Sequence, residues 1–175
     1  MQKQILAALL GAALAMPLAA QAEGSYVKLG VGPSEYKDTT DSENKTAVAI
    51  AYGFSVDKNV DVELGYAHLG KLKSFDGSAS VQTQSIYIAG VGNLPLTDTF
   101  SVFGKVGLAV NHFDMKSSGF GSSVSDTETK TRALLGLGLA YNFTKEIAGT
   151  LEYQYFGKVD HVKLSALTVG VKYGF

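Results

Sequence analysis

The sequence predicts an all-β protein, an eight-stranded antiparallel up-and-down transmembrane β-barrel. Three observations lead to this prediction. Segment 166–175 alternates strictly between apolar residues and small or polar ones, and successive side chains of a strand point to opposite faces. The same split recurs in nearly every strand-like segment. The sequence shows no helical segment that could cover the apolar stripes, so we expect the sheet to close on itself and face lipid.

The N-terminal segment is typical of a secretory signal peptide. Lys3 gives a positive start, residues 5–20 are apolar and alanine-rich, and Ala20-Gln21-Ala22 is a small-x-small cleavage signature. A single transmembrane helix is the alternative, but the apolar run is short and Pro17 interrupts it. We therefore expect cleavage after Ala22, which leaves one barrel domain over residues 23–175.

The composition excludes several classes of protein. There are no cysteines, so disulfides do not supply the stability. A formal net charge of −1 gives no basic patch for nucleic acid. The 20 glycines, 9 tyrosines and 9 phenylalanines, with 3 prolines, fit an all-β chain. Alternation hides the membrane character from averaged hydropathy, since apolar residues fall at every second position.

The first four predicted strands cover 26–31, 46–54, 60–67 and 81–93. The residues assigned to the outer face are Val27, Leu29 and Val31, then Val48, Ile50, Tyr52 and Phe54, then Val60, Val62, Leu64 and Tyr66, and finally Ile86 and Ile88. The fourth strand is ambiguous because Tyr87, Ala89 and Val91 on its other face are also apolar. We assign its isoleucines to lipid.

The last four predicted strands cover 100–110, 132–143, 147–155 and 166–175. Their outer residues are Phe100, Val102, Val106, Leu108 and Val110, then Leu135, Leu137, Leu139, Tyr141 and Phe143, then Ile147, Leu151, Tyr153 and Tyr155, and finally Leu167, Val169, Val171, Tyr173 and Phe175. Many aromatic residues fall near strand ends, which suits the interfacial girdles of a membrane barrel.

The connections alternate in length. The second-to-third, fourth-to-fifth and sixth-to-seventh are short turns, whereas the first-to-second, third-to-fourth and fifth-to-sixth are long and polar. The longest predicted loop spans 112–129. Short turns at the periplasmic end and long loops outside the cell are typical of outer-membrane barrels.

The predicted inner face is small or polar and carries isolated charges. These are Lys28, Asp61, Glu63, Lys105, Arg132, Glu152 and Lys172. Buried charges are costly unless they are paired, and both signs occur on neighbouring or facing strands. We hypothesise an internal salt-bridge network in which Glu63 and Glu152 meet Lys105 and Arg132. The alternative is that these charges lie at strand ends in water.

Several motifs resemble the OmpA transmembrane-domain family. Segments 62–70 (VELGYAHLG) and 151–155 (LEYQY) are similar to its third- and seventh-strand motifs. The LPLTD stretch at 94–98 and the terminal TVGVKYGF at 168–175 are similar too. The resemblance extends over nearly all of the chain after residue 22.

The resemblance implies an integral protein of the Gram-negative cell outer membrane, in contact with membrane lipid and lipopolysaccharide. It implies that Glu63 and Glu152 join a charged cluster in the lumen that gates a narrow path, and Lys105 is similar to a basic residue of the family's fifth strand. The chain departs from the family at Ala89 or Val91, where the family carries a lysine.

The end of the sequence carries two further expectations from the resemblance. Larger family members carry a periplasmic domain that holds peptidoglycan, which we do not expect in a chain ending at Phe175. The terminal aromatic residues Tyr173 and Phe175 resemble the signal read by the barrel-assembly machinery. The protein is expected to be a monomer.

The residues do not suggest catalysis. Barrel enzymes that act on lipid A need a nucleophile with a histidine base beside it. His68, His112 and His161 lie near the loop ends of their predicted strands, and His161 lacks a nearby His-x-Ser pairing. The acidic loop residues have irregular spacing that matches no calcium loop: Asp38, Asp41, Glu43, Asp126 and Glu128. We expect no enzyme activity, no metal and no cofactor.

Three functional classes are therefore open. The first is a structural outer-membrane barrel with at most narrow pore activity. The second is a surface adhesin or host-interaction protein acting through the 112–129 loop, whose apolar anchors would be Phe113, Met115 and Phe120. The third is a soluble periplasmic lipocalin-like barrel, which would reverse the two faces and expose Glu63 and Glu152 to water.

Overall fold

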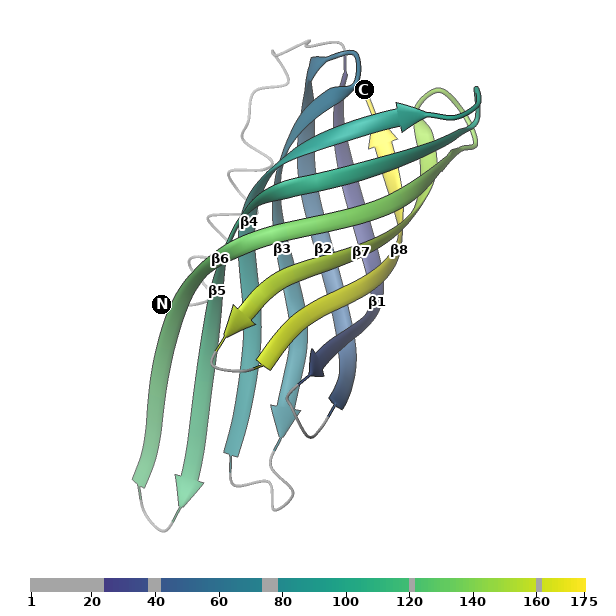
Figure 1. Ribbon diagram of the computed structural model, residues 1–175. Helices are drawn as coiled ribbons and strands as arrows, with labels where there is room; N and C mark the ends of the chain where they lie inside the picture. The colour runs from purple at the N-terminus through teal and green to yellow at the C-terminus, as the bar shows by residue number, and fades with distance from the viewer. Residues whose placement is uncertain (1–23, 38–41, 74–78, 120–121, 160–161) are drawn as a thin grey trace.

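The fold is a closed barrel of antiparallel strands (Figure 1). A computed structural model describes residues 24–37, 42–73, 79–119, 122–159 and 162–175. Each strand pairs with its sequence neighbours in the order β1 to β8. The strands are β1 (Ser25–Lys37), β2 (Ser42–Asp57), β3 (Val60–Lys73), β4 (Ala79–Pro95), β5 (Phe100–Gly119), β6 (Ser122–Asn142), β7 (Ile147–Val159) and β8 (Val162–Gly174).

Closure is made by the first and last strands. The β1–β8 ladder runs from Tyr26↔Gly174 to Lys37↔Lys163, so neither strand presents a free edge. The predicted fold class is confirmed. Across the described residues, no helix has the length and hydropathy that crossing a membrane requires. The predicted signal peptide lies outside the described residues and stays a prediction.

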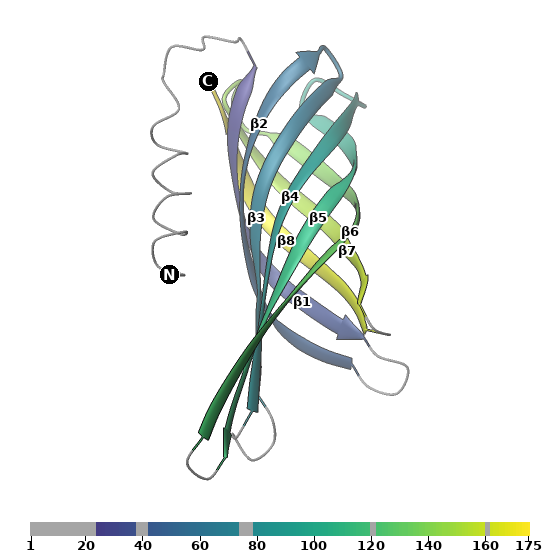
Figure 2. The same cartoon turned by 90° about the vertical axis from the view of Figure 1, so that its left-hand side faces the viewer.

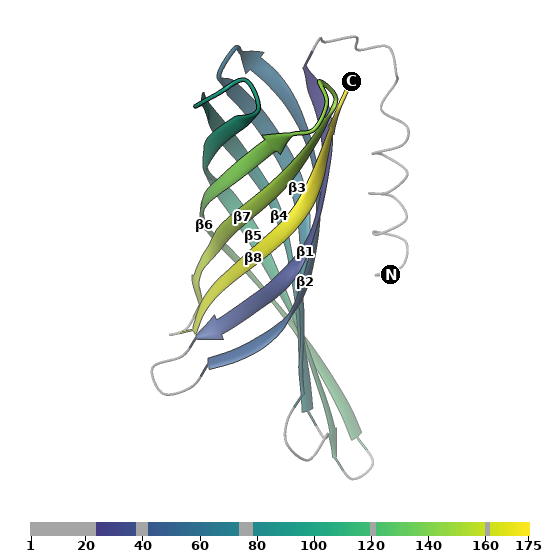
Figure 3. The ribbon, with the colours of Figure 1, turned by 90° about the vertical axis from the view of Figure 1, so that its right-hand side faces the viewer.

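The two ends of the barrel differ (Figures 1 and 2). The turns after β2, β4 and β6 cluster at one end, together with the C-terminus and the start of β1. At the other end the β5–β6 hairpin projects well beyond the ends of β7, β8 and β1 (Figure 3). The rim on the β7–β8–β1 side is therefore low, and the rim on the β3–β6 side is high.

The structure corrects the prediction of long loops, because most of the residues assigned to them extend the strands instead. Residues 112–119 and 122–129 continue β5 and β6, and their ladder is unbroken from Phe100↔Tyr141 to Gly119↔Ser122. The first and second predicted strands likewise extend to Lys37 and from Ser42. Pairing satisfies the backbone N–H and C=O groups, which polar side chains do not prevent. Polar composition therefore misled the prediction of length.

The predicted facing of the strands is confirmed. Val48, Leu137 and Val169 are 52%, 62% and 63% exposed on the outside of the barrel. Ile88 on the ambiguous β4 is 54% exposed, whereas Tyr87, Ala89 and Val91 are buried inside. The outside is thus a continuous apolar belt. Exposing this belt to water would be strongly unfavourable, at roughly 25 cal/mol per Å² of apolar surface.

Large side chains fill the outer half of the interior. The largest fully buried ones include Tyr87, Phe156, Leu69, Leu134 and Leu164. Two bulges bring Leu69 and Phe156 inward, because the register shifts between His68 and Gly70 and between Tyr155 and Lys158. Gly70 and Gly157 adopt positive φ there, which glycine tolerates without strain.

Candidate functional site

Four charged side chains converge inside the barrel from alternate strands. Lys28 lies on β1, Glu63 on β3, Lys105 on β5 and Glu152 on β7, and all four are at most 7% exposed. Small residues on the intervening strands leave room for them. At Gly136, the β6 partner of Lys105, a Cβ would lie 3.2 Å from Lys105 Cβ.

The four groups form an alternating ring. Lys28 Nζ lies 3.1 Å from Glu63 Oε2 and 2.6 Å from Glu152 Oε2. Lys105 Nζ lies 2.6 Å from Glu152 Oε1 and also contacts Glu63 Oε1. Each ammonium therefore meets both carboxylates, and the ring is electrically neutral. Such mutual pairing offsets the cost of burying four charges.

Two tyrosine hydroxyls complete the coordination of Glu63. Tyr26 donates to Glu63 Oε2 at 3.0 Å, and Tyr87 donates to Glu63 Oε1 at 2.8 Å. Both rings lie over glycines, since a Cβ at Gly53 or Gly65 would fall about 2 Å from the Tyr26 or Tyr87 ring. Glu63 thus accepts from two lysines and two tyrosines. Glu152 contacts the same two lysines, and among the described residues no tyrosine hydroxyl donates to it.

Lys172 and Asp61 lie beside this ring. Lys172 Nζ is 3.9 Å from Asp61 Oδ2 and 3.9 Å from the centroid of the Tyr26 ring. Asp61 also accepts from Ser55 Oγ at 2.7 Å and Asn93 Nδ2 at 2.8 Å. The Lys172 side chain is 31% exposed, so this pair is at the wetter margin of the cluster.

The predicted role of Arg132 in the network is wrong. Its Nε donates to the Lys158 carbonyl at 2.8 Å, and its Nη1 donates to the Thr131 carbonyl at 2.9 Å. Strand alternation predicts an inward direction but not a height along the barrel. Arg132 pairs in register with Ala109, four residues beyond Lys105 toward the outer end. Lys28 takes the place that the prediction gave to Arg132.

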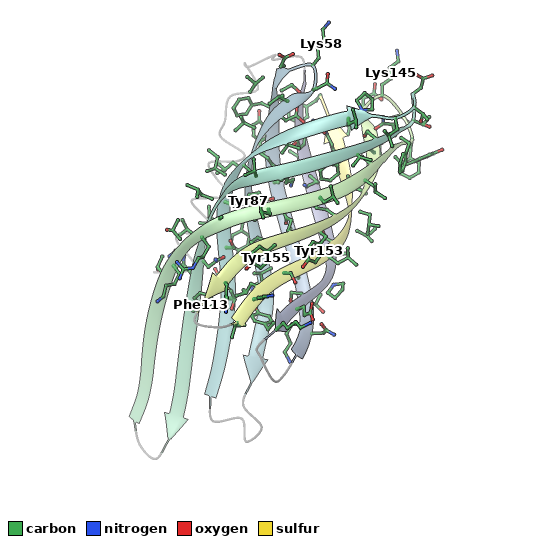
Figure 4. The ribbon with its side chains drawn as sticks, in the orientation of Figure 1. Lys58, Tyr87, Phe113, Lys145, Tyr153 and Tyr155 are labelled. Atoms are coloured by element: carbon green, nitrogen blue, oxygen red, sulfur yellow. The ribbon has the colours of Figure 1, made fainter. Side chains whose placement is uncertain are left out.

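The charge ring divides the lumen into two parts. A cavity of about 160 Å³ lies between the ring and the short-turn end, and its lining includes Tyr26, Phe103 and Lys172. Beyond the ring toward the other end, the apolar cluster around Leu69, Leu134 and Phe156 fills the interior. Figure 4 labels Tyr87, whose ring centroid lies 6.3 Å from that of Phe156.

The histidines belong to no cluster of potential metal ligands among the described residues. His68 and His112 are partly buried on β3 and β5, and the described part of the chain has no group of three potential ligands from His, Cys, Asp and Glu. His161, Asp38 and Asp41 lie outside the described residues. The side chains of Glu43, Met115, Asp126 and Glu128 are also outside what the structure describes, as is Phe120.

Sequence reasoning missed the tyrosines of the site. Tyr26 begins the first predicted strand, on the same face as Lys28, but the pattern gives it no role, and Tyr87 lies on a face of the fourth predicted strand that looks apolar. A usable signal was present for Tyr87, because buried tyrosine hydroxyls usually need a partner and the neighbouring third strand carries the inward carboxylate Glu63.

The fold and the site define an integral transmembrane β-barrel, with an apolar outside and a charged, packed inside. The lipocalin-like alternative is wrong, because Glu63 and Glu152 are 1% and 2% exposed and the apolar stripes lie outside. The chain belongs to the family described as the outer membrane protein beta-barrel domain, whose model matches residues 5–175. It is an OmpA-like protein of the Gram-negative outer membrane.

Curated relatives share this family. Outer membrane protein A of Salmonella typhi is 28% identical over 167 residues, covering 86% of this chain and 48% of the relative. Outer membrane protein A of Yersinia pseudotuberculosis is 26% identical over 187 residues, covering 96% and 53%. The chain therefore spans about half the length of the curated relatives it matches.

Solved structures share the fold. The attachment invasion locus protein Ail of Yersinia pestis superposes with a TM-score of 0.66 at 19% identity, covering 87% of this chain and 99% of that one. Neisserial surface protein A superposes with a TM-score of 0.67 at 18% identity, covering 87% and 97%.

Proposed function

We propose that this protein is a structural, non-enzymatic outer-membrane barrel whose lumen is kept closed by the ring of Lys28, Glu63, Lys105 and Glu152. The contact of each lysine with both carboxylates is the observation that carries the proposal. An ion entering from the short-turn end would have to separate these pairs. It would then meet the large buried side chains of Leu69, Leu134 and Phe156, which solvate an ion poorly.

Planar bilayer recording tests this proposal. We expect the wild-type protein to conduct weakly, and the double variant Lys28→Ala/Glu152→Ala to conduct several-fold more because it removes one positive and one negative arm of the ring. The matched control is Lys58→Ala/Glu146→Ala, which changes the same charges in exposed turns. A wild-type conductance as large as that of the ring variant would overturn the proposal.

The assembly and oligomeric state belong to the same proposal. The C-terminal segment, made of β8 with exposed Tyr173 and of the exposed Phe175 that follows it, is proposed as the segment that the barrel-assembly machinery recognises. Replacing both by serine should lower the amount of heat-modifiable barrel in the outer membrane but leave refolding in detergent intact. Equal membrane levels would contradict this role. The ladder between β1 and β8 closes the sheet, which supports a monomer, and light scattering in detergent would test it.

A second candidate function is surface adhesion through the β5–β6 hairpin. Its projection beyond the low rim favours this candidate (Figure 2), because a projecting hairpin reaches past the membrane surface. Joining Phe113 to Glu128, which are register partners, by a short turn would remove the tip and keep the barrel ladder. Adhesion is supported if cells carrying the shortened protein lose surface attachment, and unsupported if attachment is unchanged.

A further inference from the structure

Three lysines occupy neighbouring register positions at the low rim of the barrel. Lys158 on β7 pairs with Lys163 on β8, and Lys163 pairs with Lys37 on β1. All three are exposed, and directly opposed residues of neighbouring strands point to the same face. Their Cβ atoms are expected about 5 Å apart from one strand to the next. Among the described side chains, Glu35 is the carboxylate on this face of β1, two residues before Lys37.

This arrangement costs stability in water. Like charges directly opposite each other on a sheet repel, and the described strands place three lysines in a row here. The arrangement becomes favourable when an anion with several oxygens lies among the ammonium groups.

The lysine row lies at the height of the outer lipid headgroups. From Phe175 at the short-turn end to Lys163 there are twelve residues along β8. At about 3.4 Å per residue and a tilt of about 40°, this distance spans about 30 Å along the membrane normal. The hydrocarbon core of a bilayer is about 30 Å thick. The lysines therefore lie where the apolar belt meets the outer surface, as short turns mark the periplasmic end.

A groove of about 400 Å³ on the lipid-facing wall adjoins the row. Leu135 and Leu137 of β6, Tyr153 and Tyr155 of β7, and Lys163 line it. Figure 4 labels Tyr153 and Tyr155 on this wall. The groove lies where β6 steps away from β7, since their pairing stops at Leu135↔Tyr155 although β6 continues outward. The walls suit an acyl chain, and the lysine suits an acidic headgroup.

We propose that the lysine row and the groove together bind one phosphorylated lipid of the outer leaflet. Its phosphate lies among Lys37, Lys158 and Lys163, and an acyl chain lies along Leu135, Leu137 and the two tyrosines. This site is on the outside of the barrel and is independent of the proposed closure of the lumen.

The proposal is tested by native mass spectrometry of the refolded full barrel titrated with bis-phosphorylated lipid A. We expect one lipid to be retained, and Lys158→Gln/Lys163→Gln to weaken retention about tenfold. The control is Lys58→Gln/Lys145→Gln, two lysines at the short-turn end (Figure 4), which should retain the lipid as the wild type does. Equal retention by the wild type and the Lys158→Gln/Lys163→Gln variant would overturn the proposal.

Two further measurements test whether the bound phosphate belongs to a lipid and whether the variant is as stable as the wild type. Dephosphorylated lipid A should bind about tenfold more weakly to the wild type, and inorganic phosphate should not displace the lipid. Displacement by inorganic phosphate at equal concentration would indicate a simple anion site and overturn the lipid assignment. In lipid-free detergent the Lys158→Gln/Lys163→Gln variant should unfold no earlier than the wild type, because it relieves repulsion; earlier unfolding would contradict the repulsion on which the proposal rests.

Discussion

Lys105 of β5 contacts Glu63 of β3 inside the lumen, and the two side chains are 0% and 1% exposed. Neither residue is a neighbour of the other along the sheet, because β4 lies between their strands. The pair therefore links two strands that share no backbone ladder, through the inside of the barrel.

The two glutamates should differ in their effect on stability. Glu63→Gln should lower the free energy of unfolding by about 4 kcal/mol, because it breaks a buried pair with both lysines and weakens bonds from Tyr26 and Tyr87. Glu152→Gln should cost less, about 3 kcal/mol, since it disturbs the two lysines alone.

Urea unfolding in lipid vesicles measures both changes, with Glu146→Gln in an exposed turn as the control. A larger loss for Glu152→Gln than for Glu63→Gln would contradict the assigned coordination.

The ion pair of Glu63 and Lys105 should show strong coupling. The double variant Glu63→Gln/Lys105→Met should lose less stability than the sum of its single variants, by about 2 kcal/mol, because neither charge is left without its partner. A double-mutant cycle on the same unfolding midpoints measures the coupling. Additive losses would mean that the two groups do not interact in solution.

Gly65 should be required beneath the Tyr87 ring. In Gly65→Ala the new Cβ would lie 2.2 Å from Tyr87 Cζ, so the ring must move and its bond to Glu63 must lengthen. We expect a loss of about 1–3 kcal/mol. Gly92→Ala is the control, because a Cβ there meets nothing within 4 Å. Similar midpoints for the two variants would refute this packing.

A charge placed on the apolar belt should cost more folding stability the deeper it lies in the membrane. Val169 lies mid-strand on β8, whereas Val56 lies beside the turn after β2, and both are 63% exposed. Val169→Lys should cost about 2–4 kcal/mol in a bilayer and Val56→Lys about 0–1 kcal/mol. Refolding yields and unfolding midpoints in vesicles compare them. Equal costs would indicate that Val169 does not face the hydrocarbon core.

Much of the fold follows from local alternation. The apolar stripe of β8 and the small inner residues of β2 specify which face is outside, because a strand has a period of two. The same period places Glu63 and Glu152 inside. Strand lengths were less predictable, since the polar residues of 112–129 pair as a hairpin whose backbone needs no apolar side chains.

The partners of the inner charges depend on register around the whole barrel. Arg132 and Lys28 both point inward, yet Lys28 meets Glu63 and Glu152 while Arg132 bonds the Lys158 carbonyl near the outer rim. Each strand is staggered against the next, so height inside the barrel accumulates from pair to pair and no single strand reveals it. The bulges at His68/Gly70 and Tyr155/Lys158 shift the height of the following residues further.

The order of residues along each strand thus determined which side chains face lipid and which face the lumen, because alternation is a property of the extended backbone itself. Closure of the sheet decided which of the inner charges come within contact distance, and which lysines line up at the rim. Contacts of this kind join strands far apart in sequence, and their distances exist only once the register of every intervening ladder is set.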